Sequence, residues 1–183
     1  MVIALLALVV LLVGAVALMR SFNASSLVAG NIAVKRDLQN QGERGIAAAA
    51  GLFASGGALA DDNTRANDQK ASNYISYQLA SNAQGIPLVL VNDSTYATLG
   101  LTASDITDST TGVVIRYVID RQCVSTGTYD PASCQAIYAP PDKRGSAQLL
   151  KPGGPSMPAY RITVRVTDTR RNTQTYLQTI AGI

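Results

Sequence analysis

The chain has no histidine, a single glutamate (Glu43) and two cysteines. Histidine is the side chain that most readily exchanges protons near neutral pH, so its absence removes the usual general base and the central member of a Ser-His-Asp triad. Two thiols without histidine are too few to complete a tetrahedral metal site. No Gly-rich phosphate-binding motif is present in the sequence. We therefore expect no enzyme activity, no metal and no cofactor.

Charge of either sign is also sparse. The 15 Lys and Arg residues against 12 Asp and Glu residues give a net charge of +3, without a long basic block. A dedicated nucleic-acid surface needs a denser basic patch, so nucleic acid is not an expected partner. With 183 residues, 47% of them hydrophobic, the chain has room for one membrane segment and one modest globular domain.

The amino-terminal segment is strongly apolar. Met1 to Met19 carry no charged side chain, and Arg20 follows. As a helix this segment would extend roughly 28 Å, close to the hydrocarbon thickness of a bilayer. A cleaved secretory signal fits poorly, because such a signal has a basic region before its apolar core. We expect either an unusual anchor that starts at Met1, or a mature chain from which a basic leader has been removed.

The helical pattern continues beyond Arg20. Residues 21–53 contain no proline, and apolar or small residues recur there at helical spacing among charged ones. One helix is therefore expected over residues 1–54. Its apolar first half suits lipid, and its amphipathic second half is expected to pack as part of the globular domain that residues 55–183 form. A membrane helix followed by a separate juxtamembrane helix is the alternative. Gly42, Gly45 and the run Ala47–Ala50 would let a sheet approach this helix closely.

The pattern after residue 55 predicts a mixture of short elements. We expect a helix over residues 64–81, a short strand or extended segment over 85–93, a strand over 112–123 and a Pro/Gly-rich surface loop over 140–158. Two further strands flank a turn at residues 169–172. The "NDST" and "DITD" segments have oxygen atoms that could bind calcium, but turn capping is the favoured interpretation.

The last two strands alternate with period two. Tyr160, Ile162, Val164 and Val166 face one way, and Arg161, Thr163, Arg165 and Thr167 face the other. The sequence therefore predicts one buried and one solvated sheet face. The expected fold class is α+β: a long N-terminal helix whose distal half packs on a small antiparallel sheet, with a disulfide loop near one sheet end.

Cys123 and Cys134 enclose a turn-rich loop with Gly127 and Asp130-Pro131. We expect a disulfide between them, worth about 3 kcal/mol on the chain-entropy model. A bridge of this kind favours an oxidising compartment.

Several short motifs resemble type IV pilins, and among them the PilX-type minor pilins. They are Met19-Arg20-Ser21, Ala29-Gly30-Asn31, Arg36-Asp37-Leu38-Gln39 and Gln41-Gly42-Glu43, together with the closing "YRITVRVTDTRRNTQTYLQTI". The resemblance covers the first fifty residues and the last twenty-five. It implies a filament subunit that is held in the bacterial inner membrane before assembly and then forms part of an extracellular pilus.

The resemblance also implies roles for particular residues. Met1 would be the processed and methylated amino terminus, and the assembly helix would include Leu5, Leu8, Leu12, Gly14 and Phe22. Most filament-forming pilins have Glu at the fifth position, where the ammonium of a neighbouring subunit compensates the carboxylate. Leu5 cannot make that pair, which favours a place at the filament tip, with no subunit ahead. Phe22 replaces a proline that many pilins carry, so we expect less helix melting.

The expected function is thus that of a minor pilin that helps prime pilus assembly. Its partners would be other minor pilins and the major pilin, through the N-terminal helix, and a tip adhesin. The alternatives are a pseudopilin of a type II secretion system and a membrane-anchored periplasmic binding domain. A partner surface is considered at Arg161, Arg165, Arg170 and Arg171, alongside Lys143-Arg144, although a simply solvated strand face explains these charges better.

Overall fold

The computed structural model describes residues 1–138 and 156–183. The chain divides into two compact units, Met1–Asp37 and Leu38–Ile183. The helices are α1 (Val2–Gly51), α2 (Asp62–Arg65), α3 (Leu88–Val91) and α4 (Asp93–Thr98), with 3₁₀ helices η1 (Lys70–Ser72) and η2 (Thr102–Ser104). The strands are β1 (Tyr74–Ile75), β2 (Ile106–Asp108), β3 (Val113–Arg121), β4 (Ala136–Tyr138), β5 (Ser156–Asp168) and β6 (Thr173–Gly182).

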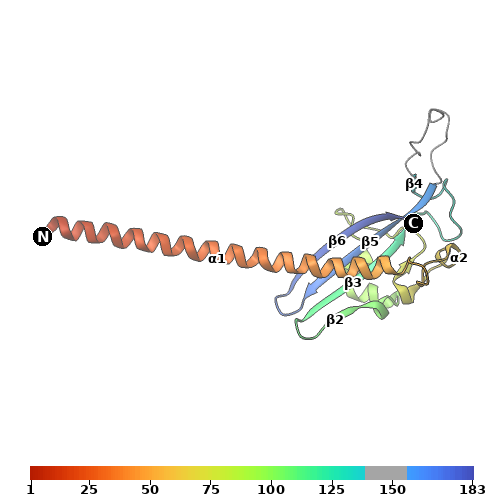
Figure 1. Cartoon of the computed structure of the whole chain (residues 1–183), viewed down its shortest axis with the longest axis horizontal. Coiled ribbons are helices and arrows are strands. Elements are labelled where there is room, and N and C mark those ends of the chain that lie inside the picture. Colours follow the sequence, from red (N-terminus) through yellow and green to blue (C-terminus); the bar gives the residue numbers. More distant parts are fainter. Residues whose placement is uncertain (139–155) are drawn as a thin grey trace, which may run out of the picture. The chain divides into compact units, whose positions relative to one another are not determined.

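Helix α1 is continuous over 50 residues (Figure 1). No proline interrupts it, and it ends at Gly51, after which the chain turns through Leu52 and Phe53. The prediction of one helix is therefore confirmed, and the alternative of two separate helices is wrong.

The sheet is mixed rather than purely antiparallel. Strands β3 and β5 form its antiparallel centre, with Val113 opposite Asp168 and Arg121 opposite Tyr160. Strands β2, β4 and β6 are also antiparallel to their neighbours, but β1 pairs with β3 in parallel. The prediction of an antiparallel sheet is wrong at β1. The long connection over residues 76–105 gives the chain room to reverse before β2 joins the same edge of β3.

The C-terminal hairpin is confirmed. Strands β5 and β6 pair continuously from Ala159–Gly182 to Asp168–Thr173, on either side of the predicted turn. Asn172 adopts a left-handed conformation with φ of 49°, which Asn tolerates better than most residues. The predicted loop over residues 140–158 lies mostly outside the described residues. Its last three residues, Ser156–Pro158, begin β5 and pair with β4.

Helix α1 packs on one face of the sheet from Leu38 onward, a shorter stretch than the predicted distal half (Figure 1). Leu38, Gly42, Gly45 and Ala49 are the buried residues of this helix. A Cβ atom added to Gly45 would lie 2.7 Å from Val164 Cγ1 and 2.8 Å from Ile115 Cγ2. The missing side chain at Gly45 therefore sets how closely the helix approaches β3 and β5. Of the alanine run, Ala49 alone is buried, and its neighbours face away.

The opposite face of the sheet is covered by the segment from Ser76 to Asp105. Its apolar cluster contains Val89, Leu90, Tyr96 and Leu101, packed with Ile75 and Val118. The prediction of a solvated face is wrong, because Arg161, Thr163 and Arg165 are all buried on it. Hydrogen bonds to the covering segment offset part of the cost of burying the two guanidinium groups.

Two local predictions are wrong, one mostly before the covering segment and one within it. The helix expected over residues 64–81 is limited to α2 and the short η1, because Asn73 turns the chain in a left-handed conformation and Tyr74 enters the sheet. The strand expected over 85–93 is instead α3, directly after Pro87, and the start of α4. Asn92 caps α4 by accepting hydrogen bonds from the N–H groups of Ser94 and Thr95, so the capping interpretation of "NDST" is confirmed.

Candidate functional site

The most distinctive surface of the chain is the apolar first half of α1. Its large hydrophobic side chains are exposed from Met1 through Ile32, without a partner in the unit Met1–Asp37. Among the described residues, α1 is the one helix long and apolar enough to cross a membrane, judged by its length and composition. A helix that is apolar on all sides needs lipid or other apolar helices around it.

The predicted assembly residues all lie on this stretch. Leu5, Leu8, Leu12 and Phe22 are each more than half exposed. Gly14 has no heavy atom of another element near the place where a Cβ would stand. Helical geometry is maintained through both Gly14 and Phe22. The structure therefore leaves these side chains available for contact with lipid or with another chain.

The second half of α1 has a different surface. From Leu38 onward, one side of the helix is buried on the sheet while Glu43 and Arg44 remain exposed. Arg44 donates a hydrogen bond of 2.7 Å to Gln41 one turn earlier. One helix thus provides an apolar surface in its first half and a domain-packing face in its second.

The arginines considered as a partner surface do not form one. Arg161 is 7% exposed and donates to Asp120 Oδ1 at 2.9 Å and to Asp120 Oδ2 at 2.6 Å. Arg165 is 6% exposed, donates to Leu90 O at 2.7 Å and also pairs with Asp93. These two side chains hold the covering segment and are not available to a partner.

Arg170 and Arg171 lie in the exposed turn between β5 and β6. Arg170 donates to Thr110 O at 2.7 Å, and Arg171 forms an ion pair of 3.2 Å with Asp168. They are separated by burial from Arg161 and Arg165, so the four arginines do not make a common charged patch. Lys143 and Arg144 lie outside the described residues.

The predicted disulfide is confirmed: Cys123 and Cys134 are bonded. Their loop is fastened by backbone hydrogen bonds as well, since Val124 N donates to Ser133 O at 2.9 Å. The sequence had identified this pair from its spacing and the turn formers between the two residues.

Titratable groups around the sheet have shifted pKa values with structural causes. The hydrogen bond from Arg165, together with charge from Arg116, lowers the pKa of Asp93. Burial, followed by the nearby Asp105, raises the pKa of Tyr96. Arg116 itself pairs with Asp93 at 2.9 Å and with Asp105 at 2.8 Å. These groups tie the covering segment to β3 and β5.

Within residues 1–138 and 156–183, no cluster of three His, Cys, Asp or Glu side chains has the geometry to hold a metal ion. The residues that sequence reasoning missed are the buried arginine–aspartate pairs. The sequence does contain a signal for such pairs: an Arg-x-Thr-x-Arg alternation in a strand, with Asp residues scattered elsewhere. This pattern does not indicate which Asp pairs with which Arg.

The fold and this surface define a class: an α+β domain with a disulfide, joined to a helix that is long and apolar enough to cross a membrane. No family model, curated protein or solved structure matches the chain. The function must therefore be inferred from the residues and the geometry.

Proposed function

We propose that this chain is a minor pilin of a type IV pilus, which helps prime assembly and lies in the tip complex of the filament. The observation that carries the proposal is the division of α1 into an exposed apolar first half and a C-terminal part, from Leu38 onward, that is packed on the sheet. A filament subunit needs the first half twice, in the membrane before assembly and against other helices afterwards.

The pilin-like motifs support the same interpretation. They include Met19-Arg20-Ser21 at the end of the apolar run and Gln41-Gly42-Glu43 in the packed half. Gly42 lies where a side chain would collide with Leu177 of β6, so this motif also fits the helix to the sheet. The partners in this proposal are other pilins along α1 and an adhesin at the tip.

The tip position rests on Leu5 being the fifth residue of the processed chain. A carboxylate buried among apolar helices is costly unless a cation compensates it. A subunit with Leu at this position has no need of the ammonium group of a subunit ahead. It can therefore occupy the first place in the filament.

The proposal is tested by counting this chain in sheared filaments. The wild-type chain is expected there at low copy number relative to the major subunit. Leu5→Glu should raise its copy number, because the new carboxylate can pair with a neighbouring amino terminus. Leu8→Glu is the matched control: it places the same charge about one turn away and should lower incorporation.

Absence of the wild-type chain from sheared filaments would contradict the pilin assignment. An unchanged copy number and position for Leu5→Glu would contradict the tip position alone. Recovery of the chain in secretion-system filaments instead would favour a pseudopilin.

A further inference from the structure

Arg121 differs from the other buried arginines of this chain. It is 2% exposed, at the end of β3, and donates to the carbonyl groups of Ser76 at 3.0 Å and Gly127 at 2.6 Å. The other buried arginines each have a carboxylate partner: Arg65 with Asp62, Arg161 with Asp120, and Arg165 with Asp93. Among the described residues, Arg121 has none. A buried charge without a counter-ion is costly, so its position requires an explanation.

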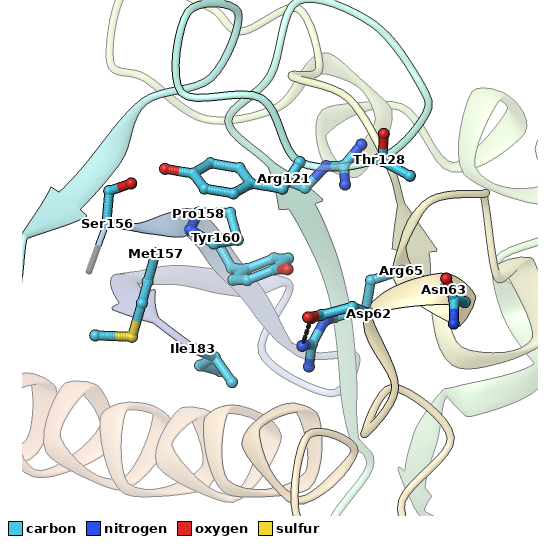
Figure 2. Close-up of a pocket in the computed structure, with 11 residues that line it drawn as sticks. Asp62, Asn63, Arg65, Arg121, Thr128, Ser156, Met157, Pro158, Tyr160 and Ile183 are labelled. Atoms are coloured by element: carbon cyan, nitrogen blue, oxygen red, sulfur yellow. Dashed lines mark hydrogen bonds and ion pairs between the residues drawn. The ribbon is translucent and has the colours of Figure 1, made fainter.

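Arg121 lines a cavity of about 460 Å³. This volume is in the range of small-molecule sites, roughly 300–1,000 Å³. Figure 2 shows the polar side chains of Arg121, Thr128 and Arg65 toward one side of the cavity, and Met157 and Ile183 toward the other. The charged side chains therefore lie at one end of the cavity, and the other end combines Met157 and Ile183 with the hydroxyl group of Ser156.

The guanidinium group of Arg121 is the donor that the structure offers to this cavity. It already donates to the carbonyl groups of Ser76 and Gly127, but neither partner carries a charge. A hydrogen bond to a charged acceptor is stronger than one to a neutral acceptor, so a ligand with an anionic acceptor group complements Arg121.

The charges at the cavity define the ligand further. Asp62 offsets the charge of Arg65 through their ion pair, which leaves the charge of Arg121 uncompensated. A single negative charge would balance it, whereas a phosphate dianion would exceed it. Met157, Pro158 and the ring of Tyr160 offer a wall for an apolar body.

We propose that this cavity binds a small organic monocarboxylate. Its carboxylate accepts a hydrogen bond from Arg121, and its apolar body lies against Met157 and Tyr160. The site is independent of the proposed pilus function, because all of its residues belong to the unit Leu38–Ile183.

Benzoate is the probe that tests this site, with benzyl alcohol as the uncharged analogue of similar shape. Binding to the full chain in detergent micelles is measured by NMR titration. Benzoate should bind saturably, and benzyl alcohol at least roughly tenfold more weakly, since hydrogen bonds to charged groups are worth more than neutral ones. The site is absent if benzoate does not saturate or if both probes bind equally.

Arg121→Lys provides a second test that keeps the charge but removes the forked donor. It should weaken benzoate binding by roughly tenfold, while thermal melting confirms that the variant is folded. Tyr138→Phe is the control, because Tyr138 is exposed on β4 and does not line the cavity. Undiminished binding in a folded Arg121→Lys variant would also overturn the proposal. If this variant does not fold, the comparison of benzoate with benzyl alcohol decides the question.

Discussion

Arginine side chains on β3 and β5 hold the sheet to the segment that covers it. Arg161 contributes most contacts, since it bonds Asp120 and also donates to Leu79 O, Ser81 Oγ and Gly85 O. Asp120 is fully buried and accepts further hydrogen bonds from Leu79 N and Gln122 Nε2. At this scale the domain depends on paired buried charges rather than on apolar contact alone.

Replacing Arg161 with methionine is expected to destabilise the domain by about 3–5 kcal/mol, because it leaves Asp120 fully buried without its arginine partner. Chemical denaturation measures the free energy of unfolding. Arg171→Met is the control: the Arg171 side chain is 62% exposed, and Asp168 keeps the hydrogen bonds from the backbone N–H groups of residues 170 and 171, so the loss should cost at most about 1 kcal/mol. Equal losses in the two variants would show that Arg161 has no special role.

Asp93 makes the domain sensitive to acid. Its pKa is lowered from the ordinary value of 3.8, chiefly by the hydrogen bond from Arg165. A carboxylate with a lowered pKa in the folded state contributes stability above its ordinary pKa, and that contribution is lost as the pH falls through the folded value. We therefore expect the stability of the wild type to decrease below about pH 4.

The comparison is between melting temperatures at about pH 6 and about pH 3. Asp93→Asn should be less stable at the higher pH and should lose less on acidification than the wild type. Asp37→Asn, an exposed change on α1, should keep the wild-type loss. If Asp93→Asn lost as much melting temperature on acidification as the wild type, Asp93 would not be a source of the acid sensitivity.

Sequence alternation identified one sheet face correctly and misjudged the other. Tyr160, Ile162, Val164 and Val166 are buried, as apolar side chains predict. The arginines at the alternate positions led to the prediction of a solvent-exposed face. That prediction was wrong because a strand pattern gives no information about a covering segment that lies seventy to eighty residues away in sequence.

At the scale of secondary-structure elements, the close approach of α1 to the sheet depends on Gly45. Val164 and Ile115 are almost completely buried where they face Gly45, and both have β-branched side chains that adjust poorly. A methyl group at this position would have to displace the helix or the sheet.

Gly45→Ala is therefore expected to destabilise the domain by about 1 kcal/mol. Overpacking costs about 1–3 kcal/mol, while the better helix propensity of alanine returns up to about 1 kcal/mol. The matched variant Gly51→Ala should leave stability unchanged or slightly higher, because nothing lies within 4 Å of its added Cβ. Denaturant titration of both variants measures the difference, and a stabilised Gly45→Ala would refute close packing here.

Element prediction succeeded where the pattern was long. Helix α1, strand β3 and the C-terminal hairpin were recovered from periodicity over many residues. The residues between α1 and β3 form short helices and turns whose type is set by caps such as Asn92 and by burial of Tyr74 and Leu90. Such short elements have too few residues to establish a period, so tertiary contacts decided them.

At the scale of the whole molecule, α1 combines two surfaces: an exposed apolar one and one that packs on the sheet. The sequence predicted this division of α1 from its apolar first half and its amphipathic second half, and the structure has the corresponding exposed and packed surfaces. The parallel strand β1 and the second layer on the sheet were not predicted, because both arise from contacts between distant parts of the sequence.

The most direct measurement of the central claim is the mass of the amino-terminal peptide of this chain, isolated from sheared filaments. Processing as a pilin predicts a peptide that begins at Met1 and carries one added methyl group, at low abundance beside the major subunit. A peptide that retains an upstream extension, or the absence of this chain from the filaments, would contradict the account.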